Sequence, residues 1–233
     1  MNELRLVLEA ISIASQITLI FFLLRSSSFR RYPFLLVYSV LQLIITGVEE
    51  YVYRVYSLSS QFYGKLYWTD EVIMDLLLFL MVIVLTYRAL ESSPLRAGMG
   101  RLLGAVVLIV VTVPFVLFSA RRFSTPWFDG TAQLLNFGAA IMNLGLWTAL
   151  IGTKKRDRLL LTVSAGLGVA VTGAAIAFGL RRFTPPTSTP QQLANLFKTL
   201  TYLASVAIWC WAFRPAARKS PTPPTAVTTS TQS

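Results

Sequence analysis

The stretch QQLANLFKTLTYLASVAIWCWAF, residues Gln191–Phe213, is long and apolar enough to cross a membrane as a helix, yet it contains a lysine, Lys198. In a helix, Lys198 lies about two turns below the start of this segment. The same stripe of the helix carries, at spacings of three and four, Asn195, Tyr202, Ser205 and Trp209. A charged group at this depth needs a partner, so this stripe is predicted to face protein or water rather than lipid.

The composition of the whole chain predicts an integral membrane protein. Its 233 residues are 55% hydrophobic and only 13% charged, and the apolar residues occur in blocks. Seven blocks are long enough to span a bilayer as helices: approximately residues 6–24, 33–53, 68–87, 102–120, 128–151, 159–180 and 193–213. We therefore expect an all-α, polytopic fold with one seven-helix transmembrane domain, residues 1–213. Residues 214–233 are rich in proline and threonine and predict a disordered cytoplasmic tail.

Lysine and arginine are unevenly distributed between the two ends of these blocks. Thirteen lie in the loops after the first, third and fifth blocks and in the tail, and seven lie on the other side. Because basic loops stay in the cytoplasm, the N-terminus is predicted outside and the C-terminus in the cytoplasm of a multi-pass protein of the cell (inner or plasma) membrane. The cytoplasmic basic loops are expected to contact anionic lipid, and no nucleic-acid binding is expected.

The residue inventory excludes several cofactors and reactions. Histidine is absent, which excludes His-ligated haem, His-ligated metals and His-dependent catalytic triads. Cys210 is the single cysteine, so a cysteine zinc site or an iron–sulfur cluster is excluded as well. Gly166 and Gly168 lie inside an apolar block and predict close helix packing rather than phosphate binding. We therefore predict no catalytic residues and no cofactor.

Asp75 is the predicted partner of Lys198. If the third helix begins near Trp68, Asp75 lies as far below its start as Lys198 lies below the start of the last helix. Asp70 and Glu71 then occupy the first turn of the third helix, where the helix dipole favours carboxylates, and this is the simpler explanation of both.

A second acid, Glu49, lies on the polar stripe of the second block and has no local cation, whereas Glu50 can pair with Arg54 four residues on. Lys198, Asp75 and Glu49 are therefore predicted to form the core of an outward-facing polar site. Around this core we place Glu9, Glu71, Asn136, Asn195 and Tyr202. A buried ion pair that only fixes the packing is the simpler alternative. A weaker alternative is a Ca²⁺ or Na⁺ site formed by Glu49, Glu71 and Asp75.

Two resemblances bear on the fold. The seven-helix count, the outside N-terminus, Lys198 in the last helix and Asp75 in the third resemble a microbial rhodopsin in outline, which would imply retinal bound to the lysine. Retinal is nevertheless not expected, because Phe178 is the single aromatic residue of the sixth block and Ala194 stands where an aspartate would precede the lysine. Through Tyr67, Trp68 and Glu71, the chain is also similar to uncharacterised small bacterial seven-helix integral membrane proteins. That resemblance implies a fold and a location.

Two functions are compatible with these features. The first is a non-catalytic ligand-binding or sensor bundle, or an accessory subunit of a larger membrane complex. No soluble domain is attached, so a protein partner or a second copy of the chain is expected to receive any signal. The alternative is a secondary transporter or a proton- or ion-coupled carrier that uses Asp75, Glu49 and Lys198. The lack of ionisable residues in the inner half argues against a continuous polar path.

Overall fold

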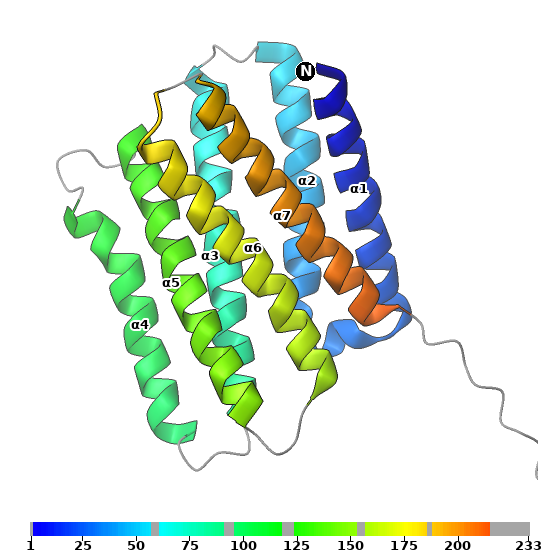
Figure 1. Cartoon of the computed structure of the whole chain (residues 1–233), viewed down its shortest axis with the longest axis vertical. Helices are drawn as coiled ribbons and strands as arrows, with labels where there is room; N and C mark the ends of the chain where they lie inside the picture. Colours follow the sequence, from blue (N-terminus) through cyan, green and yellow to red (C-terminus); the bar gives the residue numbers. More distant parts are fainter. Residues whose placement is uncertain are drawn as a thin grey trace, which may run out of the picture.

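The computed structural model of the chain is a bundle of helices (Figure 1). It describes residues 2–56, 61–90, 96–117, 124–152, 157–185 and 188–214, so the predicted tail, apart from Arg214, lies outside the described residues. Within these ranges the secondary structure is entirely helical, as predicted. The elements are α1 (Asn2–Arg25), the 3-10 helix η1 (Ser28–Arg30), α2 (Pro33–Tyr56), α3 (Gln61–Ala89), α4 (Arg96–Leu117), α5 (Thr125–Gly152), α6 (Arg158–Arg182) and α7 (Thr189–Phe213).

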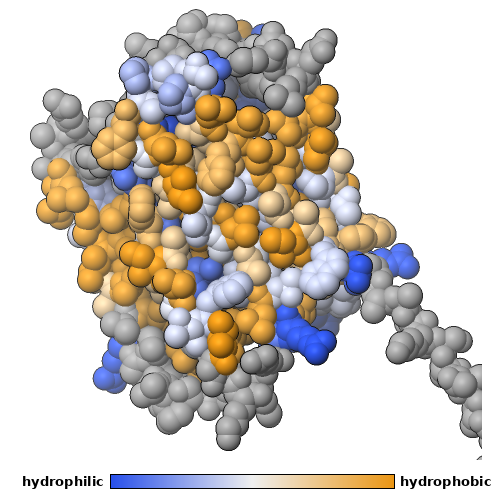
Figure 2. All heavy atoms as spheres, viewed as in Figure 1, coloured by the Kyte–Doolittle hydropathy of each residue, from blue (hydrophilic) through white to orange (hydrophobic). Residues whose placement is uncertain are grey.

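Five of these helices, α1, α2, α3, α6 and α7, are long and apolar enough to cross a membrane. Helix α4 contributes a shorter apolar stretch, Leu103–Leu117. Large apolar side chains also cover the outside of the bundle: Ile141 and Leu144 of α5 are each 70% exposed, and Leu108 of α4 is 68% exposed. Figure 2 shows apolar side chains over most of the visible face. An apolar surface of this extent fits contact with lipid rather than with water.

Six helices form a closed ring. In the order α1, α2, α3, α5, α6 and α7, each helix contacts the next, and α7 returns to α1. Helix α4 lies outside this ring against α3 and α5, at the edge of the bundle (Figure 1). The most extensive contact is between α6 and α7. The ring therefore brings α3, α6 and α7 around a common interior.

Helix α6 approaches α7 closely because glycine stands where the two helices meet. A Cβ atom on Gly173 would overlap Thr201, and one on Gly166 would overlap the indole ring of Trp209. Trp209 is fully buried and donates its indole N–H to the main-chain carbonyl of Val163 at 3.0 Å. A Cβ atom on Gly168 would likewise overlap Asn143 of α5, so the prediction that Gly166 and Gly168 serve helix packing is confirmed.

The interior of the ring is apolar toward one end of the bundle and contains buried carboxyl groups toward the other. Toward the end of α7 and the start of α6, it is filled by buried apolar side chains such as Leu23, Leu35, Val163 and Phe213. Toward the start of α3 and α7, it contains the buried carboxyl groups of Asp70, Glu71 and Asp75. The polar interior therefore lies at one end of the bundle.

The start of α3 differs from the prediction. The helix begins at Gln61, seven residues before the expected start near Trp68. Seven residues correspond to about 10 Å of helix. Asp70 and Glu71 consequently lie in the third turn, and the interpretation of both as helix-start residues is wrong. Helix α2, in contrast, begins at Pro33 as predicted, with proline in the first turn, where a missing N–H costs nothing.

Candidate functional site

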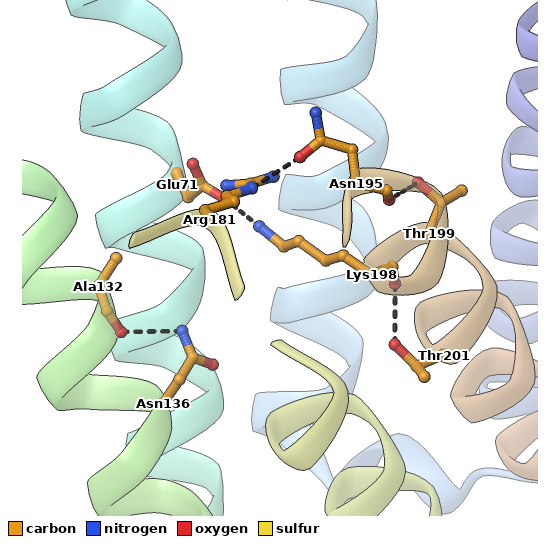
Figure 3. Close-up of polar contacts among 8 residues, drawn as sticks. All are labelled: Glu71, Ala132, Asn136, Arg181, Asn195, Lys198, Thr199 and Thr201. Carbon is orange, nitrogen blue, oxygen red and sulfur yellow. Dashed lines mark hydrogen bonds and ion pairs between the residues drawn. The ribbon is translucent and has the colours of Figure 1, made fainter. Parts of the chain in front are cut away.

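Lys198 binds the carboxylate of Glu71, across the interior from α7 to α3 (Figure 3). The Glu71 side chain is 5% exposed and the Lys198 side chain 28% exposed, so this ion pair is largely removed from solvent. The prediction that Asp75 is the direct partner of Lys198 is wrong. Because α3 begins at Gln61, Glu71 and Lys198 both lie roughly 14 Å along their helices, whereas Asp75 lies one turn deeper.

Arg181, in the last turn of α6, brings a second cation to the same carboxylate. Its Nη1 atom lies 3.7 Å from Oε1 of Glu71, and its Nε atom donates a 2.6 Å hydrogen bond to Oδ1 of Asn195 (Figure 3). In the sequence, Arg181 is one of the seven basic residues predicted to lie outside, and no role in the site was predicted for it. Two features of its position could have indicated the role. Arg181 lies at the end of an apolar block, where the helix dipole favours a basic residue, and it lies at the same level as Lys198.

The ring of Phe178 lies beside both cations. The Lys198 Nζ atom is 4.9 Å from the ring centroid, and the guanidinium carbon of Arg181 is 5.1 Å from it. Aromatic faces attract cations, and the attraction is stronger away from water. Phe178 is 1% exposed, so it forms an apolar wall behind Lys198, Arg181 and their shared partner, Glu71.

Asp75 lies deeper in the bundle and interacts with a different helix. Its side chain is 4% exposed and hydrogen-bonds with Asn136 of α5. Asn136 also donates its amide N–H to the carbonyl oxygen of Ala132 at 2.9 Å (Figure 3). Oδ2 of Asp75 and Oδ1 of Asn136 are buried, and no hydrogen-bond partner for them is found among the described residues. The structure thus keeps Asp75 and Asn136 near the cluster, one turn below the ion pair.

Glu49 interacts with Asp70 of α3 rather than with Lys198. The two side chains hydrogen-bond, and Asp70 is 9% exposed. Two carboxyl groups make such a bond only when one of them holds a proton, because ionised carboxylates are acceptors alone. The predicted pair of Glu50 and Arg54 is confirmed, with 2.7 Å between Oε1 and Nε.

The remaining candidates lie at the margin of this cluster or outside it. Tyr202 faces α1, where its hydroxyl group accepts a hydrogen bond from the amide of Gln16. Glu9, half-buried on α1, is not among the described residues that bind Glu71 or Lys198. Within the described ranges, no three His, Cys, Asp or Glu side chains come together as metal ligands. Among the described residues, Glu49, Glu71 and Asp75 are not grouped in this way.

A second polar cluster, which the sequence analysis did not identify, lies at the opposite end of the bundle. Asp157 accepts hydrogen bonds from the first amides of α6 at 3.1 and 3.2 Å and forms an ion pair with Arg31. Arg88 of α3 donates to the main-chain carbonyl of Arg31, and both guanidinium groups lie over the ring of Tyr32. Burial raises the pKa of the Tyr32 phenol, and the charge of Arg31 opposes that shift. This cluster ties the starts of α2 and α6 to the end of α3.

Together, the groups around Glu71 combine two fixed cations with carboxyl groups that can exchange protons. Such a site can bind charged ligands or protons, and its ion pairs link α3 to α6 and α7. No protein-family model, curated protein or solved structure matches this chain.

Proposed function

We propose that the chain is a multi-pass protein of the cell membrane with seven spanning helices, its N-terminus outside and its C-terminus in the cytoplasm. The five long apolar helices and the exposed apolar side chains support the membrane location. The excess of basic residues at one end of the bundle supports the orientation. In this arrangement α4 and α5 are the two further spans, and the cluster around Glu71 faces the outside.

Within this membrane frame, the chain is a non-catalytic binding or sensing bundle, or an accessory subunit of a larger complex. One observation carries this proposal: Glu71 of α3 holds cations from two other helices, Lys198 of α7 and Arg181 of α6. An anionic ligand that enters from outside would compete with Glu71 for these cations. Arg181 is the favoured contact, because a guanidinium group binds carboxylate or phosphate through two hydrogen bonds.

Ligand binding at this place would change the packing of the bundle. When a ligand replaces Glu71 at Lys198 and Arg181, the ionic link between α3 and the α6–α7 pair is released. Asn195, which holds Arg181, is exposed and marks the side from which a ligand can approach. The position of the buried acids supports a binding role over transport, because among the described residues the buried charged side chains are limited to Asp70, Glu71 and Asp75 of α3.

The test is thermal unfolding of the full chain in mild detergent with small carboxylates, phosphate and, as a contrast, organic amines. The proposal expects a concentration-dependent rise in Tm with an anion and none with amines, because ligand binding to the folded state stabilises it. Arg181→Gln and Lys198→Met should abolish the rise. Arg158→Gln, at an exposed position at the other end of α6, is the matched control and should retain it. A rise that survives Arg181→Gln would contradict the assignment.

The accessory-subunit form of the proposal implies a partner protein or a second copy of the chain. Purification in mild detergent, followed by mass measurement of the intact complex, tests this directly. A stoichiometric second protein supports the heteromeric form, and a dimer of this chain supports self-association. A monomer that still binds an anionic ligand leaves the sensing function and removes the subunit role.

Contact with anionic lipid is proposed for the cytoplasmic end. The guanidinium group of Arg25 lies 5.8 Å from the ring centroid of Phe21, and that of Arg214 lies 5.5 Å from the ring centroid of Trp211. Both rings are more than half exposed, so the basic groups lie on apolar surface near the ends of α1 and α7. Figure 2 shows hydrophilic side chains where α7 ends. Such groups suit lipid headgroups next to acyl chains.

A proton- or ion-coupled carrier is the second candidate. The hydrogen-bonded carboxyl groups of Glu49 and Asp70, and the buried Asp75, are the observations that favour it. Reconstituted liposomes with an imposed pH gradient would test it. Proton-driven uptake of a solute that Asp75→Asn abolishes would replace the sensing role with transport.

A further inference from the structure

We propose that Asp75 and Asn136 form a proton-binding site in the interior of the bundle, one turn below the ion pair of Glu71 and Lys198, in which Asp75 is a carboxylic acid paired with the side-chain amide of Asn136. Asp75 is the central residue of α3, a helix of 29 residues. This site lies beyond the ligand-binding role of Glu71, Lys198 and Arg181, and it does not require that role to be correct.

The hydrogen-bond inventory of the two side chains leads to this site. The Asn136 amide has two N–H donors and one carbonyl acceptor. One N–H binds the Ala132 carbonyl at 2.9 Å, and the side chain also hydrogen-bonds with Asp75. Two buried oxygens then have no partner among the described residues, Oδ1 of Asn136 and Oδ2 of Asp75. Both are acceptors, and an acceptor buried without a donor is unfavourable.

A single proton satisfies both oxygens. When Asp75 takes a proton from water onto Oδ2, that oxygen becomes an O–H donor, and Oδ1 of Asn136 is the acceptor beside it. The amide N–H still binds the other carboxyl oxygen, so acid and amide are joined by two hydrogen bonds. The step transfers one proton and no electrons. It also removes a negative charge from a position where burial disfavours charge.

The charged groups around Asp75 permit this assignment. Those that act on it are Lys198 from α7, Arg181 from α6, Glu71 on α3 itself and Tyr38 from α2. Lys198, Arg181 and the N–H donated by Asn136 favour the ionised form, but both cations are already bound to Glu71. Glu71 favours the protonated form, because a second carboxylate nearby disfavours another negative charge.

Release of the proton would couple this site to the ion pair above it. An ionised Asp75 would compete with Glu71 for Lys198, since both carboxyl groups act on the same ammonium group. Proton occupancy of Asp75 would therefore set how strongly α3 and α7 are joined through Glu71. This coupling gives the bundle a means to respond to protons.

Infrared difference spectroscopy of the full chain in lipid nanodiscs, with the pH stepped from acid to alkaline, tests the proposal. At neutral pH we expect the carbonyl stretch of a protonated carboxylic acid, shifted by ¹³C labelling of the aspartate side chains. Asp75→Asn should remove this band, and Asn136→Leu should move it to higher frequency because the amide partner is lost. Asp157→Asn is the matched control and should leave the band in place, because Asp157 is ion-paired with Arg31 at the opposite end of the bundle and asparagine can keep its role as the cap of α6. A wild-type spectrum without the band, or a band that Asp75→Asn leaves unchanged, would overturn the proposal.

Two further measurements cover the cases in which Asp75→Asn does not fold or a metal ion takes the place of the proton. If Asp75→Asn does not fold, the frequency change in Asn136→Leu decides the assignment. Thermal unfolding in sodium chloride and in choline chloride distinguishes a proton from a metal ion. Equal stability in the two salts supports a proton site. Stabilisation specific to sodium that is lost in Asn136→Leu would overturn it in favour of a sodium site at these oxygens.

Discussion

The indole N–H of Trp209 in α7 donates a 3.0 Å hydrogen bond to the main-chain carbonyl of Val163 in α6. The same indole ring packs edge-on against Tyr38 of α2, with ring centroids 6.0 Å apart. One fully buried side chain thus joins three helices below the charged cluster. The contact holds α6 and α7 close together, and these two helices carry the cations Arg181 and Lys198.

Gly173→Ala should weaken the contact between α6 and α7. The added Cβ would overlap Thr201, one turn from Lys198, and overpacking of this kind costs about 1–3 kcal/mol. Gly179→Ala is the control, because nothing lies within 4 Å of a Cβ at Gly179. Alanine there should be neutral or stabilising, since it favours a helix more than glycine does. Thermal unfolding in detergent compares the two variants, and equal losses would show that close approach at Gly173 is not required.

Tyr32→Phe should reduce the sensitivity of the protein to alkaline pH. Burial raises the pKa of the Tyr32 phenol in the folded chain above its usual value of about 10. A group with a raised pKa contributes stability that is complete below its unfolded pKa and is lost as the pH rises above it. The wild type should therefore lose stability above about pH 10, and Tyr32→Phe should lose less.

At neutral pH, Tyr32→Phe should be close to neutral in its effect. The Tyr32 hydroxyl is buried and has no hydrogen-bond partner among the described residues, so its removal leaves no other group unpaired. Tyr51→Phe, at a side chain that is 67% exposed, is the control and should leave the pH profile unchanged. Melting temperatures recorded from neutral to alkaline pH give both comparisons. A Tyr32→Phe profile identical to that of the wild type would refute the prediction.

Single cysteines at the two ends of the bundle test the orientation. In a Cys210→Ala background, Thr189→Cys lies at the start of α7 and Ser26→Cys lies just after α1, both at exposed positions. An impermeant maleimide should label Thr189→Cys on intact cells or spheroplasts. It should label Ser26→Cys only after the membrane is opened. The reverse pattern would place the cluster around Glu71 on the cytoplasmic side.

The all-helical fold and the five helices that are long and apolar enough to cross a membrane follow from block length and hydropathy, but helix starts do not. Residues 61–67 include Lys65 and Gly64, which lower the local hydropathy, although they form the first turns of α3. Hydropathy marks the part of a helix that is apolar and not the point at which it begins. The error of two turns made Asp75 appear level with Lys198, when Glu71 holds that position.

The sequence indicated most of the residues that meet in the candidate site, but not which of them pair. Lys198, Glu71, Asp75 and Asn136 were all named, because charged and amide groups inside an apolar segment must face other helices. The pairing depends on which helices are neighbours and on their relative depth, and no spacing within a single helix contains that information. Arg181 was missed because basic residues are also common in the loops that follow membrane spans. Its position in the sequence therefore did not distinguish it from a loop residue.

A double-mutant cycle between Glu71 and Lys198 tests the central claim most directly. Glu71→Gln strands two cations, whereas Lys198→Met leaves Glu71 with Arg181. Loss of one partner of a buried pair costs about 3–5 kcal/mol of stability. Lys198 is partly exposed, so the loss of stability in Lys198→Met should lie at the lower end of this range or below it. Glu71→Gln should therefore be the more destabilising single change.

The measurement is the free energy of unfolding of the wild type, both single variants and the double variant in the same detergent. We predict that Glu71→Gln with Lys198→Met recovers part of the loss, with a coupling energy of about 1–3 kcal/mol, while the cycle of Asp75→Asn with Lys198→Met shows a clearly smaller coupling. Additive losses for Glu71 and Lys198, together with strong coupling between Asp75 and Lys198, would contradict the ion pair on which the proposed site is built.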